Sequence, residues 1–233
     1  MRLSRWVLTL PLVLAPFAAC LPHPSGDYDD FVDETAGLRG VARDGGGIAV
    51  EASVPVEKTK GVYFAVCLPS LVTGRVDRAL RFYAETEFTP TEGGAGTLKM
   101  LLSPFAVAAR TFSRDSIAGP ALDVGDAIPV TAAADFSGAI STANIPGAAN
   151  PISGSDISIV DITLAGKFSA SGNFCSDFKG QVTQPIQNAF VAQCLYLDLE
   201  EGTTFDVIPP SEQPETYLVI GDKRFGKDDF GCQ

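Results

Sequence analysis

The amino-acid sequence predicts an all-β protein, an antiparallel β-sandwich or barrel with a short N-terminal helix. From Gly45 onward, apolar and polar residues alternate with a period of two, which is typical of strands that bury one face and expose the other. No long stretch of helical periodicity separates these strands, so parallel strand–helix–strand units are not expected. The 23 glycines and 16 prolines indicate a chain rich in turns.

The predicted helix covers about residues 28–37. Acidic residues crowd its start, where they interact favourably with the helix dipole, and Gly37 or Gly40 ends it. Four neighbouring carboxylates could in principle bind a divalent cation. The spacing of a calcium-binding loop is absent, however, and a solvated helix face is the simpler interpretation. These carboxylates belong to Asp27, Asp29, Asp30 and Asp33.

Alternating segments predict the strands in chain order. The four longest lie at about 48–56, 80–88, 130–140 and 160–168, and shorter ones lie at 60–68, 97–102, 179–184, 190–199, 203–208 and 215–220. Alternation alone does not distinguish a sandwich from a barrel. The Pro- and Gly-rich segments 113–129 and 142–156 resemble long crossovers and favour the sandwich, because an up-and-down barrel would have shorter turns.

Five large apolar residues occupy inward positions of these strands. In a closed barrel they could line a pocket for an apolar ligand, but in a small β domain such residues more often fill the core. They are Phe82, Phe88, Phe136, Ile162 and Phe168.

Four cysteines after residue 20 predict two disulfides, because an even number in an exported chain is typical of a disulfide framework. Cys67 and Cys194 lie in the apolar runs VYFAVCL and FVAQCLYL, whereas Cys175 and Cys232 lie in FCSDFKG and DDFGCQ. Similar contexts favour the pairs Cys67–Cys194 and Cys175–Cys232. A local Cys175–Cys194 bridge remains an alternative. A metal site is not expected, since there is no C-x-x-C spacing and no histidine in the folded domain.

The first twenty residues have the pattern of an export signal. Arg2 and Arg5 precede a twelve-residue apolar segment, 6–17, which is too short to cross a bilayer. The next feature, Phe17-Ala18-Ala19-Cys20, resembles the lipobox of bacterial lipoproteins, although Phe17 stands where Leu, Val or Ile is usual. The resemblance implies cleavage before Cys20, acylation of that cysteine and a membrane anchor.

The same resemblance suggests where the anchor lies and how the chain is divided. Leu21 follows the cysteine, where Asp would resemble an inner-membrane retention signal, so outer-membrane sorting is expected. We predict a signal peptide at 1–19, the lipidated Cys20 with a tether to residue 27, and one β-rich domain at 28–233.

Charge excludes one class of partner. Without residues 1–19 the chain carries 15 basic and 28 acidic side chains, a net charge of −13. Because a strongly acidic protein repels phosphate backbones, nucleic acid is not an expected partner.

Catalysis is not expected either, and no cofactor is implied. The single histidine, His23, lies in the tether, so the folded domain has no imidazole to activate a nucleophile. Ser176 and Lys179 match an S-x-x-K pattern similar to that of penicillin-binding serine enzymes, but the companion motifs are missing. Glu85 and Asp161 are outward carboxylates for which a solvated surface is the default.

The sequence therefore predicts a lipid-anchored envelope protein with a non-catalytic binding or structural role. The alternative is a lipocalin-like carrier of an apolar ligand, and an envelope hydrolase is the third hypothesis. The expected partners are the membrane, through the lipid, and either another envelope protein or an apolar ligand.

Overall fold

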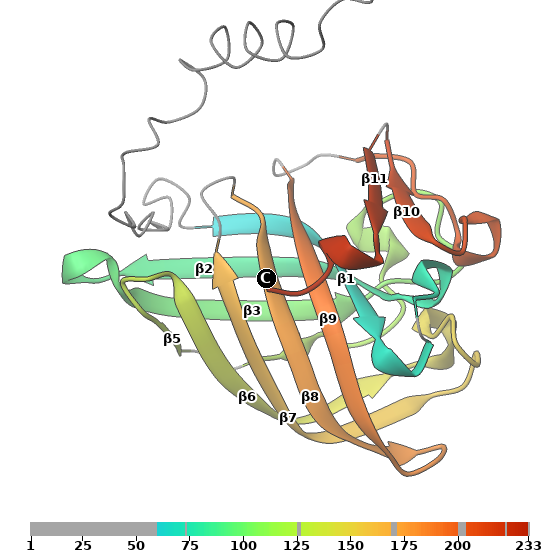
Figure 1. The fold of residues 1–233 in the computed structure, drawn as a ribbon, viewed down its shortest axis with the longest axis horizontal. Coiled ribbons are helices and arrows are strands. Elements are labelled where there is room, and N and C mark those ends of the chain that lie inside the picture. Colours follow the sequence, from blue (N-terminus) through green and yellow to red (C-terminus); the bar gives the residue numbers. More distant parts are fainter. Residues whose placement is uncertain are drawn as a thin grey trace, which may run out of the picture. The chain divides into compact units, whose positions relative to one another are not determined.

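Eight antiparallel strands close into a barrel in the computed structural model of the chain (Figure 1). The structure describes residues 60–72, 74–124, 127–168, 172–199, 204–221 and 223–232. Cys20, the tether with His23, the predicted helix at 28–37 and the predicted strand at 48–56 lie outside these ranges. Within the described ranges, no helix has the length and apolar character needed to span a bilayer.

The barrel strands follow one another around the circumference in chain order, and the last pairs with the first. They are β1 (Lys60–Pro69), β2 (Leu80–Pro90), β3 (Gly96–Pro104), β5 (Ile128–Val130), β6 (Asp135–Ile145), β7 (Ile157–Phe168), β8 (Phe174–Gln184) and β9 (Asn188–Leu199). The two-residue β4 (Leu122–Asp123) pairs with β3. A separate hairpin contains β10 (Tyr217–Ile220) and β11 (Lys223–Gly226).

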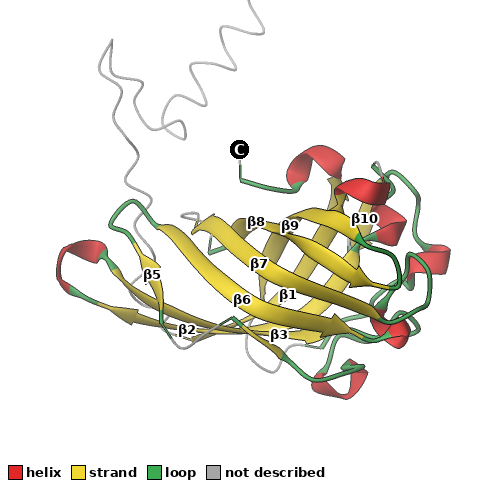
Figure 2. Ribbon diagram, turned by 90° about the horizontal axis from the view of Figure 1, so that it is seen from below, coloured by secondary structure: helices red, strands yellow, loops and turns green. Residues whose placement is uncertain are grey.

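The preference for a sandwich was wrong, and the reason lies in the long connections. Segments 113–129 and 142–156 do not cross between sheets, since they join strands that are neighbours in the barrel. The connections 70–79, 105–121, 146–156 and 185–187 gather at one end, which we call the loop end. Figure 2 shows most of the short helical turns there. Shorter turns at 91–95 and 131–134 lie at the opposite end, which we call the turn end.

Three predicted strands differ in detail from the observed ones. The segment 130–140 is divided by a turn at 131–134, where Ala134 has a left-handed backbone (φ 66°). In β7, Asp161 (φ 51°) forms a bulge, so that Val160 is only half-buried while Ile159 and Ile162 both face the core. Of the predicted strand at 203–208, the described residues 204–208 contain only isolated bridges, at Asp206 and Val207.

Two apolar cores lie on the two sides of the barrel wall. The inner core fills the barrel with side chains from all eight strands. The outer layer covers the outside of β1 and β2 with residues of segments 105–117 and 205–230. This double burial explains the continuous apolar run of β1, in which Ala65 faces inward while Phe64 and Val66 face the outer layer.

Both disulfides join segments that are far apart in the chain. Cys67 and Cys194 are directly paired residues of β1 and β9, so their bond crosses the seam where the barrel closes. Cys175 of β8 bonds to Cys232 and ties the C-terminal segment to the barrel. These are the pairs that similarity of sequence context favours, and the alternative Cys175–Cys194 bridge is not formed.

Candidate functional site

The barrel interior is packed rather than open. All five inward residues predicted as pocket-lining or core are at most 6% exposed. The aromatic rings of Phe136, Phe168, Phe174 and Tyr196 pack against one another toward the turn end. An internal cavity of about 20 Å³ remains among apolar side chains that include Phe82, Ile162 and Phe178. This space is about the size of one water molecule and too small for an apolar ligand.

Ser176 and Lys179 are on opposite sides of the barrel wall. Residues three apart in a strand point to opposite faces. Ser176 is therefore buried inside, where its Oγ lies 3.0 Å from Tyr196 Oη, and Lys179 is exposed outside. Burial raises the pKa of Tyr196, and the hydrogen bond between Tyr196 and Ser176 opposes this shift. Lys179 is therefore not placed to accept the proton of Ser176.

Glu85 and Asp161 do not face each other across a cleft. Glu85 lies on β2 and forms an ion pair with Arg114, whereas Asp161 is exposed at the bulge of β7. Four strand-to-strand steps around the barrel separate β2 from β7. The paired-carboxylate arrangement of a glycoside hydrolase is not formed by these two residues.

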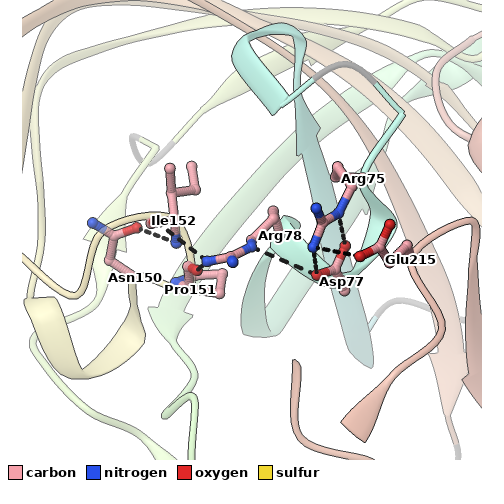
Figure 3. Close-up of polar contacts among 7 residues, drawn as sticks. All are labelled: Arg75, Asp77, Arg78, Asn150, Pro151, Ile152 and Glu215. Atoms are coloured by element: carbon pink, nitrogen blue, oxygen red, sulfur yellow. Dashed lines mark hydrogen bonds and ion pairs between the residues drawn. The ribbon is translucent and has the colours of Figure 1, made fainter. Parts of the chain in front are cut away.

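A network of charged residues holds the loop end together (Figure 3). The buried carboxylate of Asp77, in the helical turn η2 (Val76–Arg78), accepts hydrogen bonds from Arg75 Nε at 2.8 Å and Arg75 Nη2 at 2.7 Å. Arg78 Nε lies 3.5 Å from the same carboxylate, and Glu215 is 3.1 Å from Arg75 Nη2. The hydrogen bonds from Arg75 hold the pKa of Asp77 below its ordinary value.

The same network reaches the β6–β7 connection. Arg78 Nη1 donates to the carbonyl of Pro151 at 2.6 Å, and Asn150 Oδ1 accepts from the backbone N–H of Ile152 at 2.9 Å. Arginine therefore links the β1–β2 connection to the β6–β7 connection and, through Glu215, to the C-terminal segment. These loops form a fixed surface because each is tied to another by charge-assisted hydrogen bonds.

Arg81 lies beneath this network with few partners. It is 4% exposed, and Nη1 donates to the carbonyl of Ile208 at 2.7 Å, while Nε and Nη2 have no hydrogen-bond partner among the described residues. Burial lowers the pKa of Arg81 to about 10, so the side chain remains a cation at neutral pH. Its role is to anchor the C-terminal segment on β2, since solvent does not reach it.

A groove of about 300 Å³ lies outside β8 and β9 near the loop end. Asp177, Lys179 and Gln193 come from the two strands, and Lys227 and Asp228 come from the C-terminal segment. Asp177 Oδ1 is shielded from solvent and has no hydrogen-bond partner among the described residues. Apolar lining comes from Leu68, Pro69, Val191 and Ala192, with Ser70 and Gly74 at the edge. We call this the loop-end groove.

Three large apolar side chains near the loop end are exposed to solvent, and one of them, Val191, also lines the groove. Ile186 is 76% exposed in the β8–β9 connection, Leu71 is 51% exposed in the turn after β1, and Val191 on β9 is 37% exposed. Leu71 belongs to η1 (Ser70–Val72), which contacts β9. Together with the groove these three residues form the loop-end surface. Solvent-exposed apolar side chains next to polar groups are typical of a protein-binding surface.

The sequence analysis singled out Lys179, but for catalysis, and it did not identify the charged network of the loop end. The stretch Arg75-Val76-Asp77-Arg78 places opposite charges next to an apolar strand, and this contrast is the signal that could have indicated a buried ion pair. The partners at 150–152 and 215 are distant in the chain and leave no comparable signal. In the described part of the chain, His, Cys, Asp and Glu side chains form no group of three that could hold a metal ion.

Comparison of the chain with protein-family models, with curated proteins and with solved structures finds no match. The functional conclusion therefore depends on the chemistry and geometry of its own residues.

Proposed function

We propose that this chain is a lipid-anchored envelope protein with a non-catalytic binding role, and that it binds a partner protein through the loop-end surface. The resemblance of residues 17–20 to a lipobox supports the anchor at Cys20. Two disulfides are consistent with export to an oxidising compartment.

The filled barrel interior is the observation on which the binding mode depends. Ligand pockets measure about 300–1,000 Å³, and the internal cavity measures about 20 Å³. A lipocalin-like carrier would require Phe82, Ile162 and their neighbours to leave the core, at the cost of their buried apolar contacts. The outside of the barrel is therefore the better supported place for recognition.

The composition of the loop-end surface favours a protein partner. Leu71, Ile186 and Val191 expose apolar side chains that a partner could bury. Lys179 and Asp177 add polar groups to the groove that Val191 lines. Interfaces between proteins combine an apolar centre with a polar rim in this way. The network around Asp77 fixes the connection that carries Leu71, which lowers the conformational entropy lost on binding.

Two experiments test the proposal. Replacement of Cys20 by Ser should release the protein from the membrane fraction or block its processing, and unchanged attachment would contradict the anchor. For binding, a Leu71→Glu, Ile186→Glu double variant should lose a cross-linked envelope partner that the wild type captures. Ala133→Glu, an exposed alanine at the turn end, is the matched control and should retain it. Equal capture by all three proteins would exclude the loop-end surface.

A further inference from the structure

We propose that the Cys175–Cys232 disulfide is a redox-sensitive latch. It holds residues 227–232, which we call the strap, across β9 as one wall of the loop-end groove. Reduction by a dithiol opens the strap while the barrel stays closed. The inference deepens the proposed function by naming a regulation of the same surface, and its significance for binding rests on that proposal.

The position of the strap comes from contacts at both of its ends. Its first part is the turn η7 (Lys227–Asp229), whose Lys227 and Asp228 line the groove. Its last residue, Cys232, is bonded to Cys175 on the outward face of β8. Between these points the strap crosses β9, and Figure 1 shows the C-terminal end of the chain over β8 and β9.

Gly231 shows how closely the strap lies on the barrel. It has a left-handed backbone (φ 87°), and a Cβ built on it would lie 2.6 Å from Gln193 Nε2. Only a residue without a side chain fits both the backbone and the contact. Because Gln193 also lines the groove, movement of the strap changes the groove directly.

The two disulfides differ sharply in access. Cys67 and Cys194 belong to the inner core and are 2% and 0% exposed. Cys175 is half-buried and Cys232 is exposed. A reducing thiolate must reach a sulfur atom to attack it, so the latch is open to reductants that cannot reach the seam disulfide.

The reaction balances with a dithiol reductant. A thiolate of the reductant attacks one sulfur of the latch, the Cys175–Cys232 bond breaks, and a mixed disulfide forms as the other cysteine leaves as a thiolate. The second thiol of the reductant then displaces the protein cysteine. The reductant becomes a disulfide, and two electrons with two protons convert Cys175 and Cys232 to thiols.

After reduction, only non-covalent contacts hold the strap. Phe230 is 1% exposed in the outer layer, and the carboxylate of Asp229 accepts a hydrogen bond from the Gly226 N–H at 2.7 Å within the strap region. The strap can then open locally when the Phe230 ring leaves the outer layer, and this opening removes Lys227 and Asp228 from the groove. The β1–β9 pairing and its disulfide remain, so the barrel does not open with the strap.

The first test measures the order of reduction in the full chain. The protein is titrated with dithiothreitol, quenched with iodoacetamide and examined by intact mass and peptide mapping. Cys175 and Cys232 should be alkylated at least about tenfold faster than Cys67 and Cys194. Alkylation of all four cysteines in one step, or of the seam pair first, would overturn the latch.

The second test measures opening by hydrogen exchange. Reduction should accelerate exchange in residues 226–232 and leave β1 and β9 protected at the seam. A Cys175→Ser, Cys232→Ser variant should show the same fast exchange without reductant. Slow exchange in the strap of both proteins would overturn the proposal, because Phe230 would then hold the strap closed without the disulfide.

Neither test uses a partner, so the latch and the proposed binding function can fail separately. Capture of the cross-linked partner is compared between the oxidised wild type and the Cys175→Ser, Cys232→Ser variant. A change in capture supports regulation of the loop-end surface. Equal capture by both proteins overturns the regulatory role of the latch. If the Leu71→Glu, Ile186→Glu variant captures the partner as well as the wild type does, the proposed binding function is excluded, and the measured opening of the strap is unaffected.

Discussion

Replacement of Phe112 by Ala tests whether the outer layer is part of the folded structure. Phe112 is 1% exposed and lies on the β3–β4 connection, against the outside of the barrel. Its ring stacks on Tyr83 with centroids 4.8 Å apart and on Phe205 with centroids 5.0 Å apart, and it meets Phe64 edge-on at 5.4 Å. One side chain therefore joins β1, β2, segment 105–117 and the C-terminal segment.

The magnitude follows from burial and ring contacts. A buried Phe→Ala change costs about 3–5 kcal/mol in lost transfer energy and cavity formation. Each aromatic pair contributes about 0.5–1.5 kcal/mol beyond its burial. With several rings around it, Phe112→Ala should lie near the upper end of that range. Phe112→Leu keeps most of the apolar volume and should cost about 1–2 kcal/mol, mainly from the lost ring contacts.

Urea unfolding followed by tyrosine fluorescence and far-ultraviolet circular dichroism measures both variants. Coincident transitions with an unchanged m-value would give the free energies directly. A loss below about 1 kcal/mol for Phe112→Ala would refute the reasoning, since a deeply buried ring cannot be removed so cheaply. Such a result would mean that segment 105–117 does not pack on the barrel.

Three further predictions concern other parts of the fold. Asp77→Asn should lower the free energy of unfolding in urea by about 1–3 kcal/mol, because a neutral amide accepts the two hydrogen bonds from Arg75 less strongly than a carboxylate does. Because the folded-state pKa of Asp77 is lowered, its ionised carboxylate stabilises the fold above the unfolded-state pKa of about 3.9, and this stabilisation is lost as pH falls through the folded-state pKa. The free energy of unfolding of Asp77→Asn should therefore fall less steeply with acidification than that of the wild type, and equal slopes for the two proteins would contradict this. Gly166→Ala should destabilise the protein by more than about 1 kcal/mol, since a Cβ would lie 2.3 Å from the Cys175 carbonyl oxygen. The control Gly226→Ala, where the nearest atom to the new Cβ is 3.8 Å away, should change stability by less than about 0.5 kcal/mol. Equal melting temperatures for the two variants would refute this prediction. Tyr196→Phe should lower the free energy of unfolding by about 1–3 kcal/mol, because it leaves the Ser176 hydroxyl unpaired, and adding Ser176→Ala should restore part of that loss. If the two single losses measured by chemical denaturation simply add up in the double variant, the two hydroxyls do not interact.

Local patterns determined most of the strands. Alternation of apolar and polar residues is a property of a single strand with one buried face, so segments such as 80–88 and 160–168 could be recognised without knowledge of their neighbours. The prediction of the disulfide pairs from similar sequence context also had a physical basis. Cys67 and Cys194 both lie in strands buried in the inner core, whereas Cys175 and Cys232 both lie at the surface.

Closure of the barrel was decided by tertiary structure. Sandwich and barrel place the same residues inward, and they differ only in which distant strands pair. Here that pairing joins β1 to β9 across 127 residues at the seam disulfide. Segments 113–129 and 142–156 resembled crossovers because length in the chain carries no information on where a loop returns.

The loop-end surface likewise depends on segments that meet only in the folded chain. Asp77 and Arg75 are neighbours in sequence, but Glu215 and the carbonyl of Pro151 reach them from distant segments. The strap reaches the groove through a bond between Cys175 and Cys232. The sequence by itself determined that this is an alternating, disulfide-containing β chain with a lipobox-like start, because those features are local. Only the tertiary structure decided that the barrel is closed and filled and that the Asp77 network and the loop-end groove are assembled from distant segments, because those features depend on long-range pairing.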